Sequence, residues 1–405
     1  QFNRAKKELI SQIGSFKLWG KDLNPDCKLS LAHCVFEIAP NTVVTTLGQS
    51  VSRDLVTVTY NKRLKKIESE VIAKIDDANS FMFGNKQYVF NLCESNTKIF
   101  SLDIDPPLTN FTIRDAKVKQ TYHNSRYSTY GRGCQFSSSH MFILATNGSI
   151  RVLSLSSLQL LINKDEIAKT EGKQKEIGED AANVIGREYG SNDPGDFEEL
   201  DTRDPYFLEL VELIKGKPTV DDFSVHGHNL CTLANTGIVD VYYIKKIVEG
   251  ELLTPIFTIQ CTEYGTYSAI FCTKEFILVS ADDCKKEGGA KREDGVGYEL
   301  IGIRARKSVD VCYVQYPSTA TGKRSAVHQF KQFIHRNVEF IVAMRVFIYM
   351  DILAIRNKKI HPVIICHKIS NSYLNNVAVL ANRLLLFTGS EGLAGLNLFQ
   401  PHLLF

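Results

Sequence analysis

The histidine pair His226-Gly227-His228 is the clearest grouping of side chains that could do chemistry. An i, i+2 spacing on a strand puts both imidazoles on one face, where they could ligate a metal ion. A metal site needs further ligands, and the sequence offers none at a recognisable spacing. We therefore predict no metal site here and interpret the pair as a turn that precedes a strand.

A strongly acidic stretch supplies a second set of candidate ligands, this time for calcium. The carboxylates concerned are Asp193, Asp196, Glu198 and Glu199. Their spacing does not match the twelve-residue loop in which alternate positions carry oxygen ligands around a turn glycine. A partner-docking loop and a plain solvated loop are the alternatives, and we predict no bound metal.

Signatures of catalysis are missing from the sequence. It contains no Gly-x-x-x-x-Gly-Lys-Ser/Thr phosphate loop, no Gly-x-Gly-x-x-Gly after a strand and no Gly-x-Ser-x-Gly elbow. We therefore predict that the chain is not an enzyme, with no catalytic residues and no cofactor.

The elements that would position such groups are short strands. Asn147-Gly148 is typical of a type I′ hairpin, in which both central residues have φ > 0. Apolar and alternating runs around it predict strands at residues 140–146, 149–155 and 158–162. Similar units begin near residues 42, 87, 140, 228, 275, 346 and 383. Intervals of roughly 40–70 residues are near the length of a four-stranded propeller blade.

These units predict an all-β fold, a seven-bladed β-propeller with a long acidic insertion between blades three and four. Radial closure would remove the exposed edges of so many strands. We expect an N-terminal arm at 1–14 and the propeller at 15–405. Residues 15–20, with the only Trp, would add a strand to the last blade. The expected blades are roughly 30–70, 75–115, 130–163, 223–260, 265–316, 326–370 and 373–400.

The expected insertion covers residues 164–222. Residues 176–204 contain ten acids and two arginines, a charge of −8 on a chain of net charge +3, so the remaining surface should be distinctly basic. Residues 205–215 have helical periodicity, which predicts a short amphipathic helix that docks a partner. Its apolar face would comprise Phe207, Leu208, Val211 and Ile214. We expect deletion of residues 173–217 to leave the propeller folded.

Composition indicates an ordinary soluble protein, with 44% hydrophobic and 23% charged residues. No uncharged apolar run reaches 18 residues, which argues against a membrane span. Ten cysteines without a Cys-x-x-Cys pair favour free thiols in a reducing intracellular compartment, cytoplasm or nucleus. Because the sequence begins at Gln1 and not at Met, location in an organelle stays an open alternative.

The repeat pattern resembles that of WD-repeat β-propellers from about residue 30 onward. Dipeptides such as Leu102-Asp103 and Val239-Asp240 stand where that family ends a strand with Trp-Asp, although Trp19 is followed by Gly20. The family's Asp-His-Ser/Thr-Trp network is therefore not carried over. The resemblance implies a rigid platform for protein–protein contacts, commonly as a subunit of a larger assembly and without catalysis.

Three functions follow as hypotheses. The first is a non-catalytic scaffold for other protein subunits. The second is an RNA-binding or ribonucleoprotein subunit, because Arg126, Tyr127, Tyr130 and Arg132 alternate charge with rings that can stack on bases. The third is a propeller-type hydrolase, which would need two carboxylates facing each other across a pocket.

Overall fold

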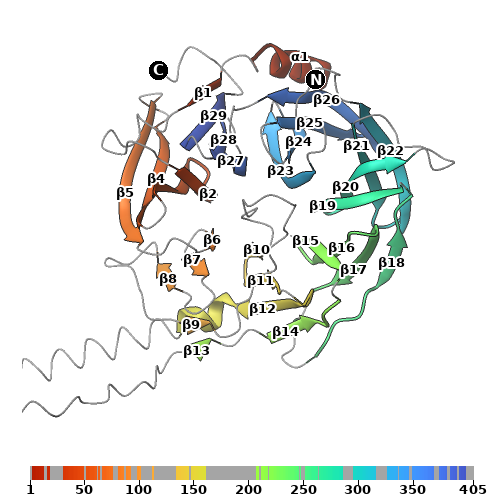
Figure 1. The fold of residues 1–405 in the computed structure, drawn as a ribbon, viewed down its shortest axis with the longest axis horizontal. Helices are drawn as coiled ribbons and strands as arrows, with labels where there is room; N and C mark the ends of the chain where they lie inside the picture. Colours follow the sequence, from red (N-terminus) through yellow and green to blue (C-terminus); the bar gives the residue numbers. More distant parts are fainter. Residues whose placement is uncertain are drawn as a thin grey trace, which may run out of the picture.

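The computed structural model arranges short β-sheets radially around a central axis, and the sheets follow one another round this axis in chain order (Figure 1). The residues it describes are 2–12, 16–18, 31–49, 52–61, 63, 66–75, 81–85, 88–92, 98–101, 112–113, 134–145, 147–160, 207–208, 211–217, 219–245, 247, 251–262, 264–285, 295–315, 326–335, 337–345, 349–368, 374–380, 384–389 and 392–397.

Four sheets are each built from four consecutive antiparallel strands. The first contains β2 (Leu31–Ala39), β3 (Thr42–Gln49), β4 (Ser52–Asn61) and β5 (Lys66–Ile75). The next contains β15 (Val220–His226), β16 (Asn229–Ala234), β17 (Ile238–Tyr243) and β18 (Phe257–Gln260). After it come β19 (Tyr264–Cys272), β20 (Phe276–Lys285), β21 (Gly295–Gly302) and β22 (Lys307–Gln315). The fourth contains β23 (Val327–His335), β24 (Val338–Arg345), β25 (Tyr349–Arg356) and β26 (Lys359–Lys368).

A fifth sheet joins the two ends of the described chain. It contains β27 (Leu374–Leu380), β28 (Leu384–Gly389), β29 (Gly392–Asn397) and the N-terminal β1 (Phe16–Leu18). Strand β1 runs antiparallel to β29, with Phe16 opposite Leu396 and Leu18 opposite Ala394. The outer strand of this sheet therefore comes from the start of the chain. The domain borders given above stay a prediction.

The prediction of seven blades is corrected to five, because within the described residues only these five sheets have four strands without a long insertion between them. A sixth sheet has three strands, β6 (Phe81–Gly84), β7 (Tyr88–Leu92) and β8 (Lys98–Ser101). A seventh contains β10 (Cys134–Phe136), β11 (His140–Leu144), β12 (Ile150–Ser154) and β14 (Val211–Ile214). Two further strands, β9 (Thr112–Ile113) and β13 (Phe207–Leu208), pair in parallel.

The position of the insertion is also corrected. It does not separate two blades, because β14 lies within residues 164–222 and pairs with β12 in one sheet. The strand predicted at residues 158–162 is wrong as well, since residues 155–160 are helical. Leu155 and Leu158 are buried there, and the Tyr88 hydroxyl donates a hydrogen bond to Gln159 Oε1. This turn of helix therefore ties the β10–β14 sheet to the three-stranded sheet.

Side chains on the first strand of a sheet bind the backbone of the next sheet's first strand. Asp222 and Ser224 on β15 accept hydrogen bonds from the N–H groups of Ile270 and Cys272 on β19, each at 2.9 Å. Residues 222 and 224 contact residues 270 and 272 in the same order along the chain, so β15 and β19 run parallel. Gln135 on β10 makes the corresponding contacts with β15, accepting from the Val225 N–H at 2.8 Å.

The same device operates where the two ends of the ring meet. Glu37 on β2 accepts a hydrogen bond from the Val379 N–H on β27 at 2.9 Å, and Gln329 on β23 accepts from the Val377 N–H at 3.1 Å. Lys331 on β23 forms an ion pair with Glu37 at 3.0 Å. These polar contacts satisfy backbone donors that face the central axis, where no fifth strand is available to pair with them.

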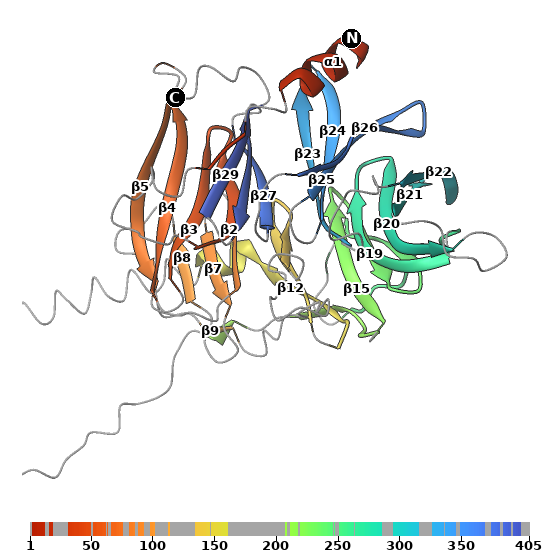
Figure 2. The same cartoon turned by 45° about the horizontal axis from the view of Figure 1, so that its top comes forward.

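Apolar side chains between the sheets form the core. Phe340, Val342 and Met344 of β24 pack against Val377 and Leu385 of the closing sheet, all at 2% exposure or less. Helix α1 (Phe2–Gln12) covers one end of this cluster, with Ala5 fully buried in it. Figure 2 shows α1 lying across the ends of β23, β24 and β26. Residues 2–12 therefore form a helix that is docked on the core.

Candidate interaction surface

The predicted histidine pair lies in the turn between β15 and β16. His226 ends β15 opposite Asn229, and His228 is exposed with its ring 5.7 Å from that of Tyr243. No group of three metal-ligating side chains occurs in the described part of the chain. The candidate calcium ligands and the ring-and-arginine stretch at 126–132 lie outside the described residues.

The hairpin tip at Asn147-Gly148 is not a type I′ turn. Gly148 has φ of 77°, but Asn147 is not among the residues with positive φ. Instead the Asn147 side chain accepts hydrogen bonds from the Ser149 N–H at 3.0 Å and hydroxyl at 2.7 Å, which holds a local turn of its own. A Cβ on Gly148 would lie 1.9 Å from the Lys217 carbonyl oxygen, so glycine is needed for close packing too.

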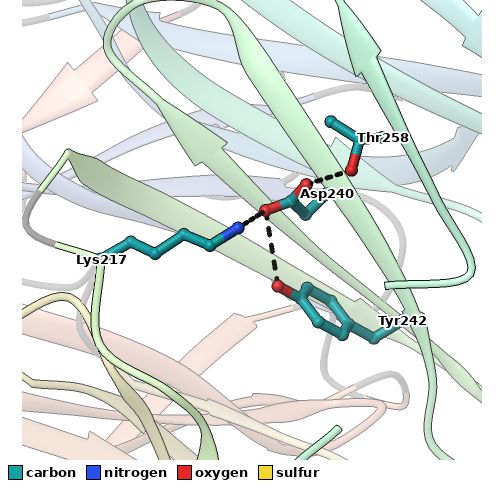
Figure 3. Close-up of polar contacts among 4 residues, drawn as sticks. All are labelled: Lys217, Asp240, Tyr242 and Thr258. Carbon is teal, nitrogen blue, oxygen red and sulfur yellow. Dashed lines mark hydrogen bonds and ion pairs between the residues drawn. The ribbon is translucent and has the colours of Figure 1, made fainter. Parts of the chain in front are cut away.

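Lys217 also belongs to a polar cluster around Asp240 that sequence reasoning did not find (Figure 3). The Lys217 ammonium donates to Asp240 Oδ2 at 2.5 Å, and the Thr258 hydroxyl donates to Oδ1 at 2.5 Å. The Tyr242 hydroxyl lies 3.5 Å from Oδ2. Asp240 is 3% exposed, so these donors replace the water that a buried carboxylate loses.

The electrostatics of this cluster point to a structural role. Burial raises the pKa of the Tyr242 hydroxyl well above its usual value, and the Asp240 carboxylate adds to the shift. Tyr242 therefore stays protonated and donates. Because both Asp240 oxygens are occupied by donors, the cluster joins β17 and β18 to the segment that enters β15.

A second buried polar cluster joins the β19–β22 sheet to the β23–β26 sheet. The Tyr298 hydroxyl donates to Asp351 Oδ2 at 2.6 Å, and the Cys366 N–H donates to Oδ1 at 2.6 Å. The Arg345 guanidinium lies 4.0 Å from Asp351 Oδ1, and both side chains are at most 1% exposed. Burial raises the pKa of Asp351 against the opposing effects of Arg345 and the two hydrogen bonds.

The predicted partner-binding helix does not form. Phe207 and Leu208 belong to β13, whereas Val211 and Ile214 belong to β14, which pairs with β12. Ile214 is 4% exposed and packs in the core beside Leu213. Apolar residues at 207, 208, 211 and 214 fit a helical period, but β-sheet pairing with β12 decides the conformation, and a four-residue strand is too short to show its alternation.

Exposed cations collect at one end of two neighbouring sheets. In an antiparallel sheet, the turn between the first and second strands and the turn between the third and fourth lie at the same end. In the β19–β22 and β23–β26 sheets these turns carry seven exposed cations, which we call the basic rim: Lys274, Arg304, Arg306, Lys307, Arg356, Lys358 and Lys359. The exposed acids at the same turns are Glu275 and Glu339.

One hydrogen bond brings the two halves of the basic rim together. Asp310, near the start of β22, accepts from the N–H of Ile360, near the start of β26, at 2.7 Å. Each strand starts directly after a charged turn, so the turns at 303–306 and 357–358 are neighbours. Exposed residues Arg4 and Lys7 of α1 extend the positive charge, because Phe2 of the same helix packs under Arg356.

Two arginines of the basic rim are held over aromatic rings. The Arg356 guanidinium lies 4.6 Å from the centre of the Phe2 ring, and that of Arg306 lies 5.7 Å from the centre of the Phe257 ring. Attraction between a cation and the face of a ring restricts where the guanidinium lies. A fixed planar fork can bind a carboxylate through two parallel hydrogen bonds.

Comparison with known proteins identifies the fold. No protein-family model and no curated sequence matches the chain. A chain in the mitotic checkpoint complex is similar, with a TM-score of 0.50, 9% identity and coverage of 92% of this chain and 90% of that one. The N-terminal domain of Nup159 has a TM-score of 0.49 and 10% identity, and the match covers 92% of this chain and 90% of that one. The WD40 β-propeller domain of Doa1 has a TM-score of 0.47 and 9% identity, with coverage of 91% of this chain and 92% of that one. These likenesses concern the fold alone, and the radial order of the sheets (Figure 1) confirms the predicted β-propeller architecture.

Among the residues that the structure describes, no helix is both long enough and apolar enough to cross a membrane.

Proposed function

We propose that the chain is a non-catalytic propeller that holds protein partners as a subunit of a larger assembly. The observation that carries this proposal is that polar side chains connect one sheet to the backbone of a neighbouring sheet. Asp222, Ser224, Gln329 and Glu37 bind the backbone of a neighbouring sheet. These contacts make the sheets one rigid body, and rigidity lowers the entropic cost of binding a partner.

The buried carboxylates support the same reading. Asp240 accepts hydrogen bonds from a lysine, a threonine and a tyrosine, and Asp351 is enclosed by Tyr298 and Arg345. A general base needs a free lone pair within reach of its substrate. Both carboxylates are instead used to hold strands together, as expected for a framework.

The assembly itself is the direct test. The chain, tagged at its natural locus, should elute with partners at constant stoichiometry on size-exclusion chromatography of a native extract. Cross-linking followed by mass spectrometry should place these partners on the turns of the propeller. Elution as a monomer under gentle conditions would contradict the proposal.

The acidic insertion is the second surface to test, with a deletion narrower than residues 173–217. Deletion of residues 173–217 would remove β14, whose Leu213 and Ile214 are buried in the core. We therefore no longer expect the propeller to stay folded after that deletion. Deletion of residues 173–204 keeps β13 and β14 and should leave the melting temperature unchanged. Loss of one partner would make the acidic segment a docking site. The partner-binding role of Phe207, Leu208, Val211 and Ile214 stays a prediction, for which a Phe207→Ala variant is the matching test.

A further inference from the structure

We propose that the basic rim binds an acidic segment of a partner protein, one in which Asp or Glu residues flank an apolar side chain. This inference rests on the proposed function and names the class of partner. The rim lies at one end of two adjacent sheets, and its charge is seven exposed cations against two exposed acids at the described turns.

Two cations of the basic rim occupy positions whose backbone conformation is unfavourable for any residue other than glycine. Arg306 has φ of 52° and Lys358 has φ of 59°, in the left-handed region that glycine adopts most easily. Asn357 and Lys358 together form a two-residue hairpin loop with both φ values positive, the turn that most favours Asn-Gly. Lysine and arginine occupy these tips although glycine would fold more easily, which is what a binding role for their charges predicts.

An apolar side chain lies on the side of the sheet that faces the charged turns. Ile334, the penultimate residue of β23, is 43% exposed and sits opposite Glu339 on β24. It is four residues from Phe330, so both point to the same side of the sheet, and Phe330 packs against Tyr298 of the β19–β22 sheet. Ile334 is therefore directed toward the junction between the two halves of the rim.

These features favour a protein segment over a nucleic acid. Proteins bind single-stranded nucleic acid by stacking bases on open aromatic faces beside basic side chains. The rings at the rim, Phe2 and Phe257, are covered by the guanidinium groups of Arg356 and Arg306. Exposed Ile334 offers a contact for an apolar side chain, which a phosphate backbone does not supply.

The test removes charge without harming the fold. In the double variant Arg306→Gly/Lys358→Gly both residues are replaced by the one best suited to a positive φ, which offsets the lost contact between Arg306 and Phe257, so the melting temperature should change little. Asn337→Gly is the matched control, because Asn337 also has φ of 58° at a turn of the same end but carries no charge.

Binding is measured by fluorescence anisotropy on the full chain with three labelled probes of equal charge at low salt. The probes are a Glu-Glu-Leu repeat peptide, a poly-glutamate peptide and oligouridylate. The Glu-Leu peptide should bind most tightly, and the double variant should bind it about fivefold more weakly, as expected for the loss of two exposed charge pairs. The Asn337→Gly control should bind like the unmodified chain, and added salt should weaken binding.

Several results would overturn the inference. Equal affinity of the double variant and the unmodified chain would remove the rim from the binding site. Tighter binding of oligouridylate, lost in the double variant, would make the rim a nucleic-acid surface. Tighter peptide binding after deletion of residues 173–204 would mean that the chain's own acidic segment occupies the rim. If the double variant loses peptide binding but keeps every partner in a native extract, the rim inference fails and the scaffold proposal stands, whereas a monomeric chain contradicts the scaffold proposal itself.

Discussion

Replacement of Gly148 by alanine should destabilise the fold far more than replacement of another positive-φ glycine. Gly148 has φ of 77°, and its added Cβ would lie 1.9 Å from the carbonyl oxygen of Lys217. A left-handed conformation costs a residue with a Cβ about 1–2 kcal/mol. Overpacking against a backbone atom that cannot rotate away adds about 1–3 kcal/mol. We therefore expect Gly148→Ala to lower the free energy of unfolding by about 3 kcal/mol.

Gly227→Ala is the control that separates the two terms. Gly227 also has a positive φ, 60°, but an added Cβ meets nothing within 4 Å. The free energy of unfolding of Gly227→Ala should fall only by the cost of the left-handed conformation, about 1 kcal/mol. Equilibrium urea unfolding of both variants, followed by far-ultraviolet circular dichroism, measures the difference. Equal losses would show that the Lys217 segment moves aside without cost, and the reasoning from close packing would be wrong.

Three further predictions concern polar contacts and the ends of the ring. Asp240→Ala should cost about 2–4 kcal/mol, whereas Lys217→Met, at a half-exposed side chain, should cost under about 1 kcal/mol, both measured by urea unfolding. Glu37→Ala should destabilise more than Glu37→Gln, since glutamine keeps an acceptor for the Val379 N–H; equal effects would make the ion pair with Lys331 the important contact. Deletion of residues 1–20 removes α1 and β1 and exposes the edge of β29, so the variant should aggregate or unfold without cooperativity, and an unchanged melting curve would refute closure by β1.

Sequence patterns located the middle and outer strands of most sheets and missed the first strand in nearly all. Strands β16, β17 and β18 follow clear apolar and alternating runs with a turn at Asn235-Thr236-Gly237. Strand β15, Val220–His226, has Asp221, Asp222 and Ser224 in its middle, which resembles a loop. Polar residues occur there because their partners are backbone N–H groups of the neighbouring sheet, and no pattern within a single strand reveals such a partner.

The segment at residues 327–335 illustrates the same limit from another direction. Val327, Phe330, Phe333 and Ile334 fit a helical spacing, and the sequence alone leaves helix and strand about equally open. The structure makes it β23, in which Phe330 faces the preceding sheet and Phe333 packs in the cluster shared with the closing sheet. A strand between two sheets is apolar on both faces, so alternation disappears and only the tertiary packing decides.

The basic rim could be predicted only in part. The acidic stretch at 176–204 implies that the other residues carry excess positive charge, but it does not say where. The cations of the rim span 85 residues, from Lys274 to Lys359, and they lie at three separate turns. They meet because antiparallel sheets return the chain to the same end at alternate turns, which is a property of the topology.

The place of the insertion explains how the fold accommodates it. The chain leaves β12 and returns as β14, the outermost strand of its sheet, so the three inner strands pair without it. Closing a long loop costs free energy that grows only with the logarithm of its length, and β14 must recover this cost through its contacts. Leu213 and Ile214 are buried, and the Leu213 carbonyl accepts a hydrogen bond from the Leu253 N–H at 2.8 Å. The outer strand is therefore held by its own sheet on one side and by the next sheet's loop on the other, which anchors the chain where it re-enters the ring after the insertion.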